Sequence, residues 1–456
     1  MPFDGRGRAA AIEGTQNRRR FAVIGAGVSG LSAAWLLSQR HDVVLYERDR
    51  RLGGHANTAD VPTPQGDVPV DAGFIVFNKP NYPNLTALFD RLGVEIDETD
   101  MSFGVSFNDG AFEFSSRGLG GIFARSTNAI SPSHWVMIAD IFRFNARAKA
   151  ALAEGLDDAV TLGEFVAAHG FSQSFVKRFL EPMAAAIWST PSLKILDYPA
   201  ASLFRFYANH GLLQTVNMPL WNTVKGGSKT YVERLAAPFR HKARLGVVVR
   251  RVARTPDGVV VTDDAGNDDR FDDVVIAAHA DRALEMIENP TTQERRLLGA
   301  FAYQANRAVL HSDARLMPQR RRAWASWNYL GGEGAPAVSY WMNLLQNLNC
   351  KRDIFVTLNP HVEPRDETIV AEFNYAHPIF DVGAMKAQKE LWSLQGVGGV
   401  WFCGAYFGAG FHEDGLQAGL AVAEDLGAVR RPWTVENESG RISRGAPAPA
   451  LPIAAE

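Results

Sequence analysis

The sequence has few cysteines, no strong charge imbalance and only one long uncharged run. Its two cysteines, Cys350 and Cys403, cannot form a disulfide framework and are typical of a reducing compartment. The formal net charge is −3, so the chain lacks the basic field that nucleic-acid binding needs. It also has no cysteine spacing of the zinc-finger type. These features argue against a disulfide-stabilised secreted scaffold and a nucleic-acid-binding protein, and we expect a cytoplasmic one.

The uncharged run extends from Phe21 to Gln39, directly after three arginines, and it has two opposed interpretations. A basic head before an apolar run is typical of an export signal, and a run of about twenty residues could span a bilayer. However, Gly25, Gly27 and Gly30 have the spacing G-x-G-x-x-G directly after FAVI, which is predicted to be a strand. This arrangement indicates a turn that brings backbone close to a pyrophosphate, followed by a helix whose N-terminus favours phosphate.

A second predicted strand, HDVVLYE, ends in Glu47. It follows the glycines by about twenty residues, where a carboxylate binds ribose hydroxyls in dinucleotide-binding folds. Neither an export signal nor a membrane-spanning helix explains this acidic residue. We therefore interpret the glycine-rich run as a nucleotide-binding element.

The segments RDRRLGGHA and VDAGFIVFN come next, and with them the chain resembles the flavin amine oxidase superfamily. The superfamily includes amine oxidases, protoporphyrinogen oxidases and carotenoid desaturases. The resemblance implies FAD as cofactor and an α/β fold, with a Rossmann-like FAD-binding domain and an inserted α+β substrate domain. Arg51, Gly53 and Gly54 match the superfamily's Arg-x-Gly-Gly-Arg element, but His55 replaces the last arginine, so a phosphate contact there is open. Paired glycines are also ordinary turn signals.

A second match lies near the C-terminus, in GVWFCGAYFGAGFHEDGLQAGLAVAEDL. It predicts a strand, a glycine-rich loop and a helix from about Gly415 to Leu426. In the superfamily this helix points its N-terminus at the flavin ring, where backbone N–H groups stabilise negative charge on the reduced flavin. Relatives carry an acidic residue after the strand's glycine, whereas Gly404 is followed here by Ala405. Glu413 or Asp414 could replace that contact, and Asp414 could instead cap the helix.

These matches predict an alternating domain organisation. FAD-binding segments are expected at 20–88, 225–285 and 393–430, and substrate-domain segments at 89–224, which is largely helical, and 286–392. Residues 1–19 and 438–456 are polar or rich in Pro and Ala, and we expect them to be disordered. By resemblance the backbone of Val249 contacts the adenine. The predicted cofactor-binding residues are Gly25, Gly27, Ser29, Gly30, Glu47, Arg48, Arg51, Gly53, Gly54, His55, Val249, Gly404, Glu413, Asp414 and Leu416.

His412 and Tyr340 are the candidate catalytic residues. His412 lies beside the predicted flavin edge and could relay a proton, because the ordinary histidine pKa is near neutrality. Alternatively, it hydrogen-bonds a loop carbonyl. Cys403, in a predicted buried strand, is interpreted as a core residue rather than a covalent flavin anchor. Tyr340, Trp341 and His377 belong to an aromatic-rich stretch, and such residues are more often core than ligand contacts.

The substrate is predicted by resemblance alone. The segments SYWMN, HPIFD and GFHEDG are similar to those of a bacterial group of FAD-binding proteins linked to modified membrane fatty acids, acting alongside methyltransferases of the cyclopropane-synthase type. This similarity implies a hydrophobic or lipid substrate, dehydrogenation of a methylated acyl chain in a phospholipid, and a lipid methyltransferase as partner. The sequence has no second G-x-G-x-x-G after a strand, so we do not expect a dedicated NAD(P)H domain.

Two other functions remain open. A true amine oxidase would need an aromatic cage, which Trp327, Tyr340 and Trp341 could build. A flavin-binding partner without catalysis is the third hypothesis, because no recognisable acid/base set is present. Since no segment beyond the glycine-rich run is long and uncharged enough to span a bilayer, any membrane contact should be peripheral, through an amphipathic or aromatic surface of the middle domain.

Overall fold

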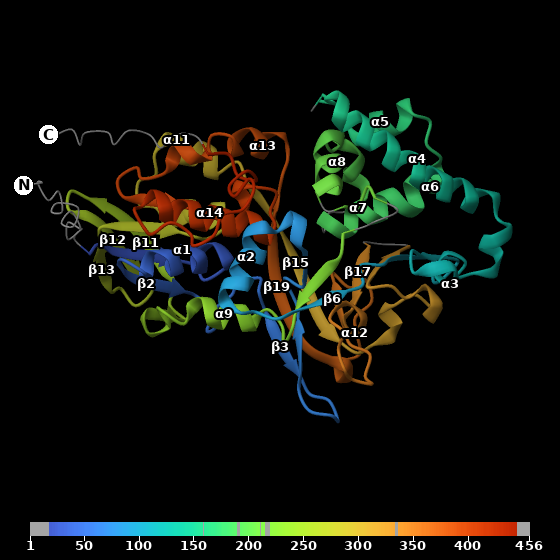
Figure 1. Ribbon diagram of the computed structural model, residues 1–456, viewed down its shortest axis with the longest axis horizontal. Helices are drawn as coiled ribbons and strands as arrows, with labels where there is room; N and C mark the ends of the chain where they lie inside the picture. The colour runs from blue at the N-terminus through green and yellow to red at the C-terminus, as the bar shows by residue number, and fades with distance from the viewer. Residues whose placement is uncertain are drawn as a thin grey trace, which may run out of the picture.

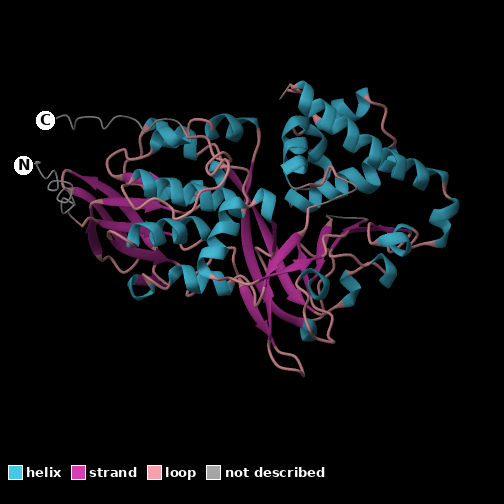
Figure 2. Cartoon of the chain, viewed as in Figure 1, coloured by secondary structure: helices cyan, strands magenta, loops and turns pink. Residues whose placement is uncertain are grey.

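The computed structural model describes residues 18–157, 159–188, 192–209, 211–214, 219–332 and 336–444. Figure 1 shows two lobes joined by long central strands, and one of the lobes contains α1 and α14. Strands and helices are mixed in both lobes, with a group of helices set apart at the upper right in Figure 2. The fold is of the mixed α/β class, as predicted.

The first lobe is built on a five-stranded parallel sheet in the order β10-β2-β1-β14-β20. Its strands are almost continuous apolar runs, as expected for a sheet covered on both faces. They come from three distant stretches of the chain: β1 (Arg20–Ile24), β2 (Asp42–Glu47), β10 (Ala243–Leu245), β14 (Asp273–Ile276) and β20 (Val400–Phe402). The strands predicted at FAVI and HDVVLYE are thereby confirmed.

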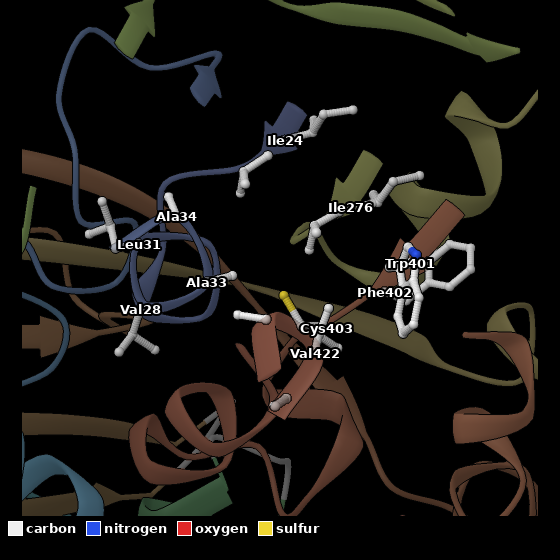
Figure 3. Close-up of a cluster of buried hydrophobic side chains, with 14 of the residues drawn as sticks. Ile24, Val28, Leu31, Ala33, Ala34, Ile276, Trp401, Phe402, Cys403 and Val422 are labelled. Atoms are coloured by element: carbon white, nitrogen blue, oxygen red, sulfur yellow. The ribbon is translucent and has the colours of Figure 1, made fainter. Parts of the chain in front are cut away.

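Two helices lie on this sheet, α1 (Val28–Ser38) and α14 (His412–Asp425). Figure 3 shows Ala33 of α1, Val422 of α14 and Cys403 converging in the core beside the parallel strands. Cys403 is fully buried, which raises the pKa of its thiol and confirms its prediction as a core residue. Helix α14 begins three residues before the predicted start, at His412.

The helices α1 and α14 touch through glycines. A Cβ atom on Gly419 would lie 2.1 Å from the carbonyl oxygen of Ser29 and 2.3 Å from Oγ of Ser32. One turn earlier, a Cβ atom on Gly415 would lie 2.8 Å from Oγ of Ser29. Because the residue numbers rise together along both helices, the helices are parallel and their N-termini lie at the same end.

The second lobe contains a seven-stranded sheet in the order β19-β15-β18-β17-β16-β7-β8. Helices packed around Phe144 form its separate helical group, and Phe144 meets Phe165, Phe171, Phe175 and Phe204 at ring distances of 5.3–6.3 Å. The strands are β7 (Phe103–Phe107), β8 (Phe112–Ser115), β15 (Ala302–His311), β16 (Trp327–Gly331), β17 (Ala337–Trp341), β18 (Phe355–Leu358) and β19 (Ile369–Ile379). The helices are α3 (Gly118–Ile122), α4 (Pro132–Glu154), α5 (Leu162–Ala168), α6 (Gln173–Phe175), α7 (Glu181–Trp188), α8 (Ala200–Asn209) and α12 (Met342–Leu345).

The remaining elements surround the parallel sheet or connect the lobes. Three strands between residues 249 and 271 form an antiparallel sheet, β11 (Val249–Thr255), β12 (Gly258–Asp263) and β13 (Asp268–Phe271). The others are β3 (Thr58–Val61), β4 (Val68–Asp71), β5 (Val76–Asn78), β6 (Ile96–Thr99), β9 (Trp221–Val224), α2 (Pro83–Leu92), α9 (Lys229–Ala236), α10 (Ala280–Met286), α11 (Thr292–Leu298) and α13 (Val382–Gln388).

Asp71, at the end of β4, links the two lobes. Its buried carboxylate accepts hydrogen bonds from Oγ1 of Thr58 (2.6 Å), the backbone N–H of Ser228 (2.9 Å) and Nε2 of Gln346 (2.9 Å). Thr58 and Ser228 lie beside the glycine-rich elements, whereas Gln346 follows α12 in the second lobe. Burial raises the pKa of Asp71 to about 6.

The predicted start of the disordered C-terminal tail, at residue 438, is too early. Residues 438–444 pack on the protein: Ile442 is buried, and Arg441 bonds the carboxylate of Asp414 at 2.5 Å. Arg441 is an isolated cation in a polar sequence, so its buried partner, which lies 27 residues earlier, is visible only in three dimensions. At the other end, the predicted tail of residues 1–19 extends too far, because Arg18 and Arg19 are described and Arg19 forms an ion pair with Asp273. The remaining residues expected to be disordered, 1–17 and 445–456, lie outside the described residues.

We expect Gly419→Ala to lower the free energy of unfolding by about 1–3 kcal/mol, because the added methyl group meets the backbone carbonyl of Ser29 as well as the side chain of Ser32. Gly120→Ala is the matched control, since its Cβ atom would meet no heavy atom within 4 Å in a short helix. The control should be neutral or stabilising by about 0.5–1 kcal/mol. Chemical denaturation measures both variants, and equal stabilities would contradict the close packing of α1 and α14.

Candidate active site

The glycine-rich turn after β1 contains three glycines with different surroundings. Gly25 has φ +105°, and a Cβ atom there would lie 2.5 Å from the carbonyl oxygen of Ala277. A Cβ atom on Gly30 would lie 1.9 Å from the carbonyl oxygen of Gly25. A Cβ atom on Gly27 would meet nothing within 4 Å, and its φ of −70° and ψ of 178° suit any residue. Protein packing therefore explains Gly25 and Gly30 but not Gly27, which borders open space where a ligand's phosphate would lie.

The Arg-x-Gly-Gly element lies against this turn. The backbone N–H of Gly53 donates to the carbonyl of Ala26 at 2.8 Å, and Gly53 pairs with Gly27 as an isolated parallel bridge. Gly54 has φ +59°, and the guanidinium of Arg51 donates to its carbonyl at 2.8 Å. Arg51 thus supports the turn, and Gly53 and Gly54 lie next to Gly27.

Glu47 lies at the end of β2, facing the same turn. Its carboxylate accepts hydrogen bonds from the backbone N–H groups of Ala26 (2.7 Å) and Asp49 (2.9 Å). Burial raises its pKa. The N–H of Val247 donates to the backbone carbonyl of Glu47 at 3.0 Å, so the segment that leads into β11, which begins at Val249, runs beside the end of β2. Arg48, by contrast, is exposed and lies 3.8 Å from Asp49.

The carboxylates of Glu413 and Asp414 bind the protein. Glu413 is buried and accepts from the backbone N–H groups of Asn84 and Leu85, both at 3.0 Å, so it caps the N-terminus of α2. Asp414 accepts from the N–H of Phe411 at 2.8 Å, which confirms its predicted capping role. These contacts account for both side chains without a cofactor. Ser29 and Leu416 are buried in α1 and α14, and Gly404 lies two residues after the end of β20.

His412, the first residue of α14, is enclosed by aromatic side chains. Its ring stacks on Phe74, with centroids 3.9 Å apart, and its Nε2 lies 2.5 Å from the hydroxyl of Tyr231. Burial lowers its pKa to about 3. The predicted alternative of a hydrogen bond to a loop carbonyl is therefore replaced by one to a tyrosine hydroxyl, and the imidazole is neutral at physiological pH.

Three more histidines gather nearby. The ring of His55 lies 4.8 Å from that of Tyr375, 5.4 Å from His377 and 6.3 Å from His279. Burial and the neighbouring imidazoles hold the pKa of His55 well below its ordinary value, and burial lowers the pKa of His377 to about 4. Nε2 of His55 is buried and has no hydrogen-bond partner among the described residues. Such an unsatisfied nitrogen is consistent with a ligand contact.

These side chains meet at the carboxyl ends of the parallel strands, where ligands bind in open α/β sheets. Sequence analysis missed Phe74, Tyr231 and His279, and gave His377 little weight. His279 could have been found, because it follows the strand β14 by three residues. Tyr231 and Phe74 could not, since only tertiary contacts bring them to His412. In the part of the chain that the structure describes, no group of three or more His, Cys, Asp or Glu side chains could hold a metal ion.

The residues present fit FAD. The open space at Gly27 and the adjoining Gly53 and Gly54 suit the pyrophosphate, and Glu47 suits the ribose hydroxyls. The N-terminus of α14 suits the electron-rich end of the flavin ring. His55, with its unpartnered nitrogen, is a further candidate contact.

Comparison with known proteins agrees with this site. The family of flavin containing amine oxidoreductases matches residues 28–313. The chain belongs to this family. FAD is therefore its cofactor, as predicted from the two glycine-rich elements.

Individual members of the family and similar structures are distant. AofH of Mycobacterium tuberculosis, assigned as a flavin-containing monoamine oxidase, is 27% identical over 288 residues, which are 60% of this chain and 60% of AofH. Cyclohexylamine oxidase from Brevibacterium oxydans has a similar fold, with a TM-score of 0.63, 17% identity, and coverage of 90% of this chain and 99% of that one. A CLA-producing fatty acid isomerase from P. acnes is similar at a TM-score of 0.62, 17% identity and coverages of 90% and 98%.

The proposed aromatic cage of this flavoprotein is incomplete. Tyr340 is buried and packs edge-to-face on Trp327, with centroids 4.9 Å apart, and burial raises the pKa of Tyr340. Trp341 packs instead on Trp324, edge-to-face at 5.3 Å, as expected for consecutive residues of a strand. The structure therefore brings together two members of the cage and separates the third. Catalysis by Tyr340 stays a prediction.

We expect Gly27→Ala to weaken FAD binding by about tenfold to hundredfold without loss of stability, because the methyl group would occupy only ligand space. Gly30→Ala, in contrast, should destabilise the fold itself, since its methyl group meets the Gly25 carbonyl. FAD affinity by fluorescence titration and unfolding by denaturant separate the two effects. Wild-type FAD affinity in a folded Gly27→Ala variant would contradict this placement of the pyrophosphate.

Buried histidines should make the protein less stable in acid. An unfolded histidine binds a proton below about pH 6.5, whereas in the folded protein the pKa of His377 is lowered to about 4 and that of His412 to about 3. Stability that is present above pH 6.5 is therefore lost as the pH falls. Asp71 has a raised pKa and acts in the opposite direction, so the test compares wild type with His377→Asn. The stability difference between them should shift in favour of the variant from about pH 7 to about pH 5, and a constant difference would contradict the lowered pKa.

Proposed function

We propose that this protein is an FAD-dependent oxidoreductase that removes a hydride from a hydrophobic substrate, and that the substrate is a methylated fatty acyl chain of a phospholipid. The observation that carries the proposal is the absence of an available counter-charge at the site, within the described residues. Four imidazoles there have lowered pKa values, and the nearby carboxylates are held by protein groups.

The engaged carboxylates argue against a charged substrate. Glu413 caps α2, and Asp414 is paired with Arg441. Asp71 accepts hydrogen bonds from three residues. An ammonium group entering the site would have to displace one of these contacts or stay unpaired, which is costly in a buried place. A saturated carbon chain needs no such partner.

The protein's own groups suit hydride removal from carbon. When bound, FAD would accept the hydride, and the N-terminus of α14 would stabilise negative charge on the reduced cofactor. The proton lost from the neighbouring carbon as the double bond forms would leave to water through a neutral imidazole such as that of His412. Phe74, His412 and Tyr231 form a closely packed wall that limits the access of water. Neutral imidazoles such as His377, which is hydrogen-bonded to Asn306 at 2.8 Å, can hold polar groups of an ester without charge.

The expected place in a reaction sequence follows from the substrate. A methylated acyl chain is the product of a methyl transfer to a lipid, so a lipid methyltransferase is the proposed partner. The name of the fatty acid isomerase supports an acyl substrate on this fold, but a likeness at 17% identity concerns the fold alone.

Amine oxidation is the second candidate. It is favoured by the names of AofH and cyclohexylamine oxidase, and by the edge-to-face pair of Trp327 and Tyr340. Aromatic faces bind cationic nitrogen. The chain spans about three fifths of AofH, so the activity of that relative is not carried over whole.

An anaerobic reduction assay tests the proposal. The FAD-loaded protein is mixed with phospholipids carrying methylated acyl chains, with the same lipids lacking the methyl group, and with a panel of amines. We expect the absorbance of oxidised flavin to bleach with the methylated lipid, at least about tenfold faster than with the unmethylated one, since a barrier lower by 1.4 kcal/mol has that effect. Bleaching by amines alone would show that the protein oxidises amines rather than acyl chains. Absence of bleaching with every candidate would overturn the proposal in favour of a non-catalytic flavoprotein.

A further inference from the structure

An exposed apolar surface lies on the second lobe, away from the candidate active site. It is formed by α3, the start of α4 and the segment between them, and we refer to it as the α3–α4 surface. Figure 1 shows these helices at the right of the molecule, opposite the lobe with α1 and α14. Its large apolar side chains, with their exposed fractions, are Leu119 (76%), Ile130 (83%), Trp135 (51%), Val136 (47%) and Phe142 (56%).

The α3–α4 surface is a packed unit rather than a set of loose side chains. The indole N–H of Trp135 donates to the carbonyl of Ala129 at 2.9 Å, and its ring lies 5.4 Å from that of Phe123, which follows α3. Contacts within the unit therefore hold its backbone in place while its apolar side chains face outward. Exposure of so many large apolar side chains in one region marks an interaction site.

Helix α4 is amphipathic in a way that suits a lipid surface. Its buried face carries Met137, Phe144 and Ala148. Its exposed face begins with apolar residues, including Trp135 and Phe142, which are seven positions apart and share one face. Lys149 lies on the same face, seven positions after Phe142, and the exposed residues Arg143 and Arg147 lie on the adjoining side of the helix. Of these three, Arg143 is also held by the protein, through Asp140 and the carbonyl of Gly170.

The charge of the α3–α4 surface indicates which kind of partner it binds. Between residues 116 and 154, which include the whole of α4, the chain has five basic residues and two acidic residues, although its overall formal charge is −3. Asp140 is buried and paired with Arg143 at 3.0 Å, and Glu154 is exposed at the C-terminal end of α4. The surface is therefore apolar and carries an excess of positive charge. The basic residues are Arg117, Arg125, Arg143, Arg147 and Lys149.

We propose that the α3–α4 surface docks the protein on the anionic surface of a lipid bilayer. Apolar side chains enter the interface between headgroups and acyl chains, and Arg and Lys pair with anionic headgroups. The contact is peripheral: in the described ranges, the helices are too short or too polar to cross a membrane. Docking would bring the second lobe, which carries the predicted substrate-binding segments, to the lipid.

Vesicle flotation with the FAD-loaded full-length protein tests this proposal. The vesicles are phosphatidylcholine alone or phosphatidylcholine mixed with phosphatidylglycerol. We expect binding to the anionic vesicles and little to the neutral ones. Reversal of two charges, Arg147→Glu with Lys149→Glu, should weaken binding by about tenfold or more. The matched control, Lys386→Glu with Lys389→Glu, changes two exposed lysines around α13 and should bind like wild type.

The apolar contribution is tested in parallel. Leu119→Ser, Ile130→Ser and Phe142→Ser together should also weaken binding by about tenfold or more. Val362→Ser with Val382→Ser is the control, because both valines are exposed apolar residues elsewhere. Substitutions at such exposed positions cost little stability, and circular dichroism verifies folding.

Three results would overturn the proposal. The first is failure of the wild type to bind anionic vesicles, and the second is equal binding by wild type and both surface variants. The third is concentration-dependent self-association that the serine substitutions abolish while no vesicle binding occurs, which would make this face a contact between copies. Flotation measures binding and not turnover, so its failure is distinguishable from failure of the proposed acyl oxidation.

Discussion

The close contact of α1 with α14 is the interaction on which the site depends. Gly419 allows α14 to touch the backbone of Ser29, and the register makes the two helices parallel. Two helix N-termini therefore lie side by side at the carboxyl edge of the sheet, although their residues are separated by almost the whole chain. Backbone N–H groups and helix dipoles there create a positive potential without a charged side chain. A larger residue at Gly419 would separate the helices and remove one of these two contributions.

Around these helix ends the ionisable side chains are either paired with other protein groups or neutral. The carboxylates of Glu413 and Asp414 bind α2 and Arg441, and the imidazole of His412 is kept neutral by burial. A site of this kind favours chemistry in which charge appears only on the bound cofactor, because a fixed ionic group would otherwise compete for it. The same distribution is the basis of the proposed preference for an uncharged carbon chain over an ammonium ion.

The two lobes are joined by polar contacts that also shape the site. Asp71 accepts hydrogen bonds from groups in both lobes, and Asn57 donates to the hydroxyl of Tyr375 at 2.9 Å, which places β19 against His55. Since buried hydrogen bonds of this kind are costly to leave unmade, the lobes hold a defined relative position. The lobe that carries the proposed lipid-binding surface is thus coupled mechanically to the flavin-binding elements.

The sequence by itself determined the nucleotide-binding elements, because the roles of Gly25, Gly27 and Glu47 depend on local backbone geometry and short spacing. It also determined the burial of Cys403, through an apolar strand. Only the tertiary structure decided the partners of Glu413, which caps a helix more than 300 residues earlier, and the meeting of His55 with His377 and of His412 with Tyr231. No local pattern encodes such contacts, because they form only when distant segments pack together and bury the same polar atoms. Burial in turn sets the pKa values of these groups, and the chemistry of the site depends on those values.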